Sequence, residues 1–205
     1  MGIVISLAVA TTAAGFAHWL SPPIFGAAAY MAASTEARGQ LGNMSERYAN
    51  LTSPIRAAGG LSARGIRSVE DADRRLAAVR EVKAARDRLE SDFRGFRSEV
   101  EGCFRRHAVP LWRCDVWVNL YSGHGGRWLG KYQRLLRSDK DLFDRFEEYA
   151  FLLRREFGHW HFQDDRLLWD DYSAVDRADQ IADEISEITQ SQARILDALE
   201  GNGKP

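Results

Sequence analysis

The segment Gly125-Gly-Arg-Trp-Leu-Gly-Lys131 has the residue spacing of a phosphate-binding loop, in which backbone N–H groups and a lysine surround nucleotide phosphates. Such a loop needs a serine or threonine directly after the lysine to bind Mg²⁺, and this chain has Tyr132 there. Trp128 would also place a bulky ring in the loop, and no parallel strands follow it. We therefore interpret the segment as a turn followed by the start of a helix.

Histidines and carboxylates near residue 160 could in principle bind a metal ion. His159 and His161 are followed by Asp164 and Asp165, and His107 and His124 occur elsewhere in the chain. Residues two apart share one side of an extended segment but not of a helix, so the histidine pair could converge only outside a helix. Histidines just past the end of a helix are more often capping or surface residues. We predict no metal site.

The two cysteines, Cys103 and Cys114, are too few for a disulfide framework or a thiolate zinc site. A turn at Pro110 separates them, so they could bridge in an oxidising compartment or remain small buried side chains in the cytoplasm. No serine, cysteine or carboxylate stands in a catalytic arrangement with a base. The sequence therefore predicts no enzyme, and no catalytic or cofactor-binding residue.

The charges are balanced overall but unevenly distributed. The chain has 28 Lys+Arg and 29 Asp+Glu, a formal charge of −1, so no global field favours nucleic acid. No Lys, Arg, Asp or Glu precedes Glu36, whereas residues 163–205 contain eleven acidic and four basic residues. The C-terminal end of the chain is thus distinctly acidic.

Residues 1–35 form an uncharged apolar segment suited to a membrane. A helix over residues 3–20 would be about 27 Å long, close to the thickness of the hydrocarbon layer. Pro22 and Pro23 would end or kink it, and residues 24–33 are too short to cross again, which suits a re-entrant or interfacial piece. Arginines exceed acidic residues in the stretch that follows, which favours a cytoplasmic location for the body.

Two other interpretations of this segment stay open. A signal peptide would have an apolar core at residues 3–17 and small residues for cleavage at 27–29, although no basic residue stands near its start. Asn43-Met-Ser and Asn50-Leu-Thr are glycosylation-type triplets that would matter if the chain were secreted after cleavage. Alternatively, the segment forms a buried, alanine-rich helix pair inside a soluble bundle.

The rest of the chain has helical periodicity. We predict a short helix over residues 36–49, a glycine-rich linker at 57–65, and a long helix from a Ser68 cap to about Arg106. An extended segment is expected at 115–121, because it is rich in β-branched and aromatic residues. Helices should follow at 127–137, 139–157 and 173–200, the last one capped by Ser173. Five tryptophans between residues 112 and 169 favour a large aromatic core, and a contact surface is the alternative.

The sequence thus predicts an all-α helical bundle with long amphipathic, coiled-coil-like helices and an apolar N-terminal helical segment. Its parts would be the membrane-associating segment 1–35, a short helix and linker at 36–67, and the bundle at 68–205. Residues 3–33 would contact a lipid bilayer. The helices at 68–106 and 173–200 would bind a protein partner or mediate self-association. The acidic last helix could lie beside the arginine-rich helix 74–106, either in the same chain or in a partner.

In layout, an apolar N-terminus before a helical bundle is similar to the HeLo-type membrane-acting cell-death domains of fungi. The residues favour a membrane-associated protein with a structural or interaction role, such as scaffolding. The resemblance implies an alternative, a membrane-perturbing effector whose residues 3–33 are sheltered in the bundle and released into a bilayer.

Overall fold

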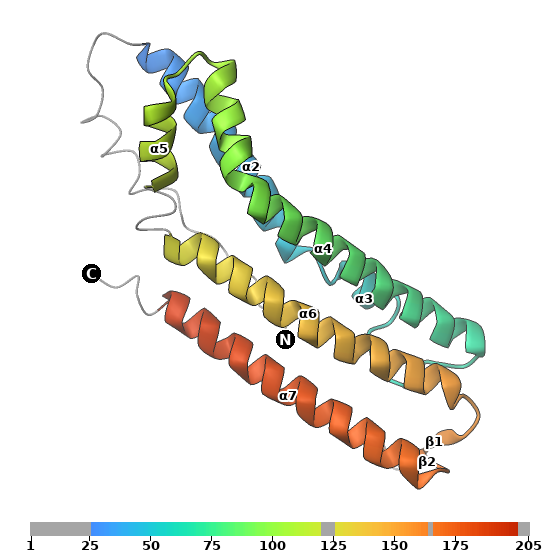
Figure 1. Cartoon of the computed structure of the whole chain (residues 1–205). Helices are drawn as coiled ribbons and strands as arrows, with labels where there is room; N and C mark the ends of the chain where they lie inside the picture. Colours follow the sequence, from blue (N-terminus) through green and yellow to red (C-terminus); the bar gives the residue numbers. More distant parts are fainter. Residues whose placement is uncertain (1–25, 120–125, 164–165, 201–205) are drawn as a thin grey trace.

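The computed structural model describes residues 26–119, 126–163 and 166–200, and most of these lie in helices (Figure 1). In chain order the elements are α2 (Ala27–Ala49), α3 (Ser53–Ala57), α4 (Val69–Arg106), α5 (Leu111–Asn119), α6 (Gly126–Arg155), β1 (Trp160–Gln163), β2 (Arg166–Trp169) and α7 (Tyr172–Glu200). The prediction of a mainly helical fold is confirmed.

Helix α4 begins where its capping residues predict. The Ser68 hydroxyl accepts a hydrogen bond from the Asp71 N–H at 3.2 Å, and Glu70 and Asp71 lie in the first turn, where acidic side chains are favoured. Buried residues recur every three or four positions from Ala72 to Phe104 and give the helix one apolar face.

The long helices run antiparallel to their neighbours (Figure 1). Helix α2 packs along α4, α4 packs against α6, and α6 packs against α7. Helix α7 touches α6 and strand β2, and α6 lies between it and α4. The acidic helix α7 is therefore not beside α4 within the chain, so that part of the predicted pairing is wrong.

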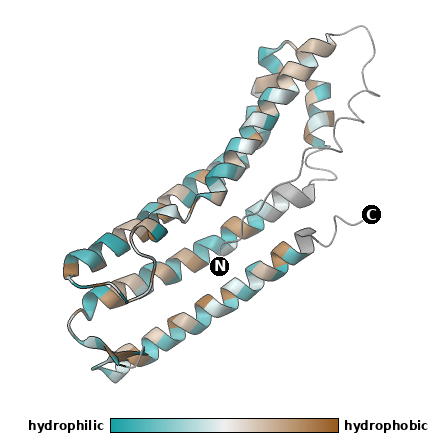
Figure 2. Ribbon diagram, turned by 180° about the vertical axis from the view of Figure 1, so that it is seen from behind, coloured by the Kyte–Doolittle hydropathy of each residue, from teal (hydrophilic) through white to brown (hydrophobic). Residues whose placement is uncertain are grey.

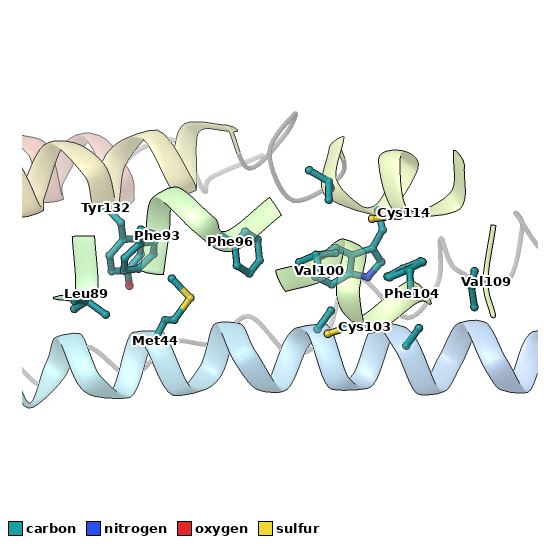
Figure 3. Packing of buried hydrophobic residues seen from close by; sticks show 14 of the residues in the cluster. Met44, Leu89, Phe93, Phe96, Val100, Cys103, Phe104, Val109, Cys114 and Tyr132 are labelled. Carbon is teal, nitrogen blue, oxygen red and sulfur yellow. The ribbon is translucent and has the colours of Figure 1, made fainter. Parts of the chain in front are cut away.

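The largest core cluster joins α2, α4, α5 and the start of α6 (Figure 3). Phe104 is fully buried there between the Tyr30 and Trp117 rings, at centroid distances of 5.8 and 6.1 Å. Phe93 stacks on Tyr132 with ring centroids 5.3 Å apart. Packing of this kind holds the α4–α5 end of the molecule together.

Most of the predicted apolar segment, residues 1–25, lies outside the described residues. Its end, from Ala27, belongs to α2, so the helix expected at 36–49 begins nine residues earlier. Ala33 and Ala37 are fully buried against the α4 side of the core. Among the helices of the described ranges, none is both long and apolar enough to cross a membrane, and their polar and apolar residues alternate along the ribbon in Figure 2.

Two predictions of local structure are wrong. Residues 111–119 form helix α5 rather than an extended segment, because burial of Arg113, Cys114, Trp117 and Val118 follows a helical repeat. The helices expected at 127–137 and 139–157 are one helix, α6, since no glycine or proline interrupts the sequence near Asp139.

A β-hairpin that the sequence analysis did not predict joins α6 to α7. Strands β1 and β2 pair antiparallel, with Trp160 opposite Trp169 and Gln163 opposite Arg166. The turn before it contains Gly158, whose φ of 91° suits glycine. After the hairpin, Asp171 rather than Ser173 caps α7, because its carboxylate accepts the Ser173 N–H at 3.0 Å.

Candidate functional site

The phosphate-loop spacing at residues 125–131 does not produce such a loop in the described part of the chain. Residues 126–131 are the first turns of α6, and Gly125 lies outside the described residues. Tyr132, which replaced the expected serine or threonine, is buried against Phe93. The interpretation as a helix start is confirmed.

The histidines near residue 160 meet one carboxylate on the surface of the hairpin. Nδ1 of His159 and Nδ1 of His161 lie 3.9 and 3.8 Å from the two oxygens of Asp170. Asp164, Asp165 and His124 lie outside the described residues, and His107 is elsewhere, 2.9 Å from Glu36. Within residues 26–119, 126–163 and 166–200, no three or more His, Cys, Asp or Glu side chains are grouped to hold a metal ion.

The two cysteines belong to the largest core cluster and are both free thiols (Figure 3). Burial raises the pKa of Cys114 to about 11 and also raises that of Cys103, so both remain protonated near neutral pH. Their environment is that of buried packing residues and does not favour nucleophilic chemistry.

The described tryptophans are divided between core and surface. Trp117 is buried, Trp160 and Trp169 are half-buried against the small core beneath the hairpin, and Trp112 is 57% exposed. The side chain of Trp128 lies outside the described residues. The expected aromatic core thus holds for some of these tryptophans, whereas Trp112 is exposed at the surface.

A buried polar junction, which the sequence analysis did not identify, joins α2, α4, α6 and α7. At its centre is Asp139 of α6, only 7% exposed. The Gln192 amide of α7 donates to Asp139 Oδ1 at 2.9 Å, and Tyr48 of α2 faces the same carboxyl group. Burial raises the pKa of Asp139 to about 6, although Tyr48, Gln192 and the charge of Arg86 act in the opposite direction.

Arg86 supplies the α4 side of this junction. Its side chain is 3% exposed, and its Nε donates to the Leu136 carbonyl of α6 at 2.7 Å. Its Nη2 lies 2.6 Å from the Glu90 carboxylate. Glu90 thus offsets the charge of the buried guanidinium, and the hydrogen bonds of Arg86 and Asp139 connect α6 to α4 and α7.

The α4–α5 end of the molecule carries an exposed apolar group. Leu111, Trp112 and Val116 of α5 are 41, 57 and 37% exposed, and Met31 near the start of α2 is 49% exposed. Beneath them Arg113 is buried, with its guanidinium carbon 5.7 Å from the Tyr30 ring centroid and 5.2 Å from that of Trp112. This end is the place where the undescribed residues 1–25 join α2.

Helix α7 forms the other open surface. Ala174, Ala178 and Ile181 are buried against α6, but Ile185, Ile188 and Ile195 further along the same stripe are only half-buried. Between Ala182 and Ala193, one flank of this stripe has no charged residue: Ala182, Ser186, Thr189 and Ala193 follow one another at helical spacing, and all four are exposed.

No protein-family model, characterised protein or solved structure matches the chain in the three comparisons made. The function is therefore inferred from the geometry of the chain itself.

Proposed function

We propose that this chain is a membrane-associated interaction protein, in which α7 binds a helix of a partner and the apolar N-terminal segment contacts a bilayer. The observation that carries the proposal is the one-sided packing of α7. Helix α6 covers the buried part of its apolar stripe and leaves the half-buried isoleucines and the uncharged flank accessible. A helix whose apolar stripe is wider than the area that one neighbour covers typically packs against a second helix.

Charge favours a partner helix that is basic as well as apolar. Helix α7 contains seven acidic residues and two arginines, so pairing two copies of α7 would bring like charges together. Within the chain, Arg145 of α6 lies 3.2 Å from Glu184, and Arg177 of α7 pairs with Glu148. A basic partner would extend this pattern of charge pairing.

Helix α4 is a weaker binding surface than the sequence analysis expected. Many of its basic side chains already have acidic neighbours: Arg80 and Lys83 pair with Glu147, and Arg106 pairs with Glu36 of α2. Its apolar face is covered by α2, α5 and α6. These contacts support α7, rather than α4, as the proposed partner surface.

Site-specific photo-crosslinking of the full-length chain tests this proposal. A photoreactive phenylalanine analogue replaces Thr189 on the uncharged flank, and the matched control replaces Glu187, which lies on the charged side of the same helix. We expect a crosslinked product from position 189 and none from position 187. A product of twice the chain mass would show self-association instead, and equal products from both positions would contradict a specific α7 surface.

The membrane part of the proposal needs a separate measurement. After carbonate washing, the full-length chain should stay with the membrane fraction and be released by detergent, because residues 3–20 carry no charge. Release by carbonate alone would contradict a bilayer contact through this segment without bearing on α7.

A membrane-perturbing effector is the second candidate, favoured by the exposed apolar group on α5 beside the start of α2. Dye leakage from liposomes should then occur with the full-length chain and disappear when residues 1–25 are deleted. This deletion leaves α2 intact, which removal of residues 1–34 would not, since Ala33 is a core residue.

A further inference from the structure

Helix α5 has apolar residues on both sides, and the charged residue on its outer side, Asp115, is paired with Arg97 of α4. Cys114, Trp117 and Val118 pack into the core, while Leu111, Trp112 and Val116 point away from it. Exposed apolar side chains that are grouped on one surface often mark a contact site. The outer side of α5 therefore lacks a cover among the described residues.

Arg113 also indicates that a further segment packs against α5. Its side chain is 6% exposed and lies against the rings of Tyr30 and Trp112. Its Nε and Nη2 are shielded from solvent and have no hydrogen-bond acceptor in the described part of the chain. Buried donors of a charged group are costly to leave without partners, so an acceptor is expected close to this position.

The apolar segment before α2 is within reach of this position. Arg113 contacts Tyr30, one helical turn after Gly26, and only residues 21–25 separate Gly26 from Leu20. Leu20 and Gly26 are six Cα–Cα steps apart and so at most about 22 Å from one another, which keeps Leu20 near the α5 end of the molecule. Such a short tether gives the segment a high effective concentration there.

The segment also offers suitable acceptors. It contains no carboxylate, so it can offer Arg113 only oxygens of its backbone and its few polar side chains. A helix over residues 3–20 leaves its last carbonyls without helical donors, and Pro22 and Pro23 have no N–H to satisfy them. A cationic guanidinium is favoured at this end of a helix.

We propose that the outer side of α5 is the docking site for residues 3–20 of the same chain, with Arg113 donating hydrogen bonds to the backbone carbonyls of residues 17–20. Leu111, Trp112 and Val116 contact the apolar side chains of this segment. The docked state shelters the segment when no bilayer is present. This contact goes beyond the proposed function and does not involve α7.

Hydrogen exchange of the full-length chain, measured by mass spectrometry without lipid or detergent, tests the docking. Val116→Glu places a charge on the docking surface. Val69→Glu is the matched control, because Val69 is also 37% exposed but lies at the other end of α4. We expect residues 3–20 to be protected in the wild type and in Val69→Glu. In Val116→Glu, their protection should fall by about tenfold or more.

Three results would overturn the proposal. Residues 3–20 could exchange at the rate of an unstructured peptide in the wild type, or be equally protected in all three proteins. Their protection could also rise with protein concentration, which would assign the occupant to a second copy. The same spectra report on residues 72–104 of α4. If these residues stay protected while residues 3–20 lose protection, docking is lost and the fold is intact.

Discussion

Replacing Asp139 with asparagine should stabilise the protein at neutral pH but not at acidic pH. Asp139 is buried at the junction of four helices, and its pKa is raised from the ordinary value of 3.8 to about 6. The folded state therefore holds the proton more tightly than the unfolded state does. The stability that the protonated carboxyl contributes is present below about pH 4 and is lost as the pH rises through about 6.

The size of the effect follows from this rise in pKa. One pKa unit corresponds to about 1.4 kcal/mol, so the rise to about 6 amounts to a loss of about 3 kcal/mol between pH 4 and pH 7.5. Asparagine can still accept the Gln192 hydrogen bond and does not ionise. Arg86 keeps the Leu136 carbonyl and Glu90 as partners, so removing the carboxylate does not isolate its charge.

Urea denaturation of the full-length protein, followed by far-UV circular dichroism at pH 4 and pH 7.5, measures the difference. We expect Asp139→Asn to exceed the wild type in free energy of unfolding by about 3 kcal/mol more at pH 7.5 than at pH 4. Asp141→Asn, on an exposed position of the same helix, is the control and should show no comparable dependence. An equal difference at the two pH values would refute the assignment of a buried, ionising carboxyl.

Three further substitutions test the packing and the backbone, each by urea denaturation at pH 7.5. Phe104→Ala should lower the free energy of unfolding by about 3–5 kcal/mol, because it leaves a cavity at a fully buried position. Ser68→Ala should cost about 1 kcal/mol through loss of the α4 cap, whereas Ser98→Ala on the exposed side of α4 should change it by less than about 0.5 kcal/mol. Gly65→Ala should cost about 1–3 kcal/mol, because its φ is +83° and the new Cβ would lie 3.3 Å from Arg75; no loss there would contradict this backbone conformation.

The long helices could be predicted because their signals are local. Helix α4 starts at a serine cap followed by acidic residues, and its bounds agree with the prediction. Helix α7 is also found within one residue of its predicted start, although Asp171 takes the capping role. Periodicity and caps act over a few residues, so one sequence is enough to recognise them.

Helix α5 could not be predicted because its composition favours a strand, whereas its packing in the fold requires a helix. The tryptophans and valines at 112–118 have a high strand propensity, but two of them, Trp117 and Val118, pack beside Phe104 only when the segment is helical. The hairpin was missed for a related reason. Its strands are only four residues each, and the first one comes shortly after Gly158, so the sequence resembles an ordinary loop.

The buried junction was missed because it joins residues far apart in the chain. Tyr48, Asp139 and Gln192 come from three helices. From the sequence alone, Asp139 stands at the start of the helix predicted for residues 139–157. One signal was available: Gln192 interrupts the apolar stripe of α7. A polar residue within such a stripe predicts a buried polar partner on the facing helix.

This interruption bears directly on the proposed role of α7. A stripe of isoleucines and alanines could pack on α6 equally well after a shift of seven residues, since the apolar pattern would be preserved. The Gln192–Asp139 hydrogen bond and the ion pair of Arg145 with Glu184 would both be broken by such a shift. They therefore fix α7 in one register and one rotation on α6. A partner can recognise the flank that contains Ala182 and Thr189 only if this rotation is fixed, so the buried junction positions the surface that α7 offers.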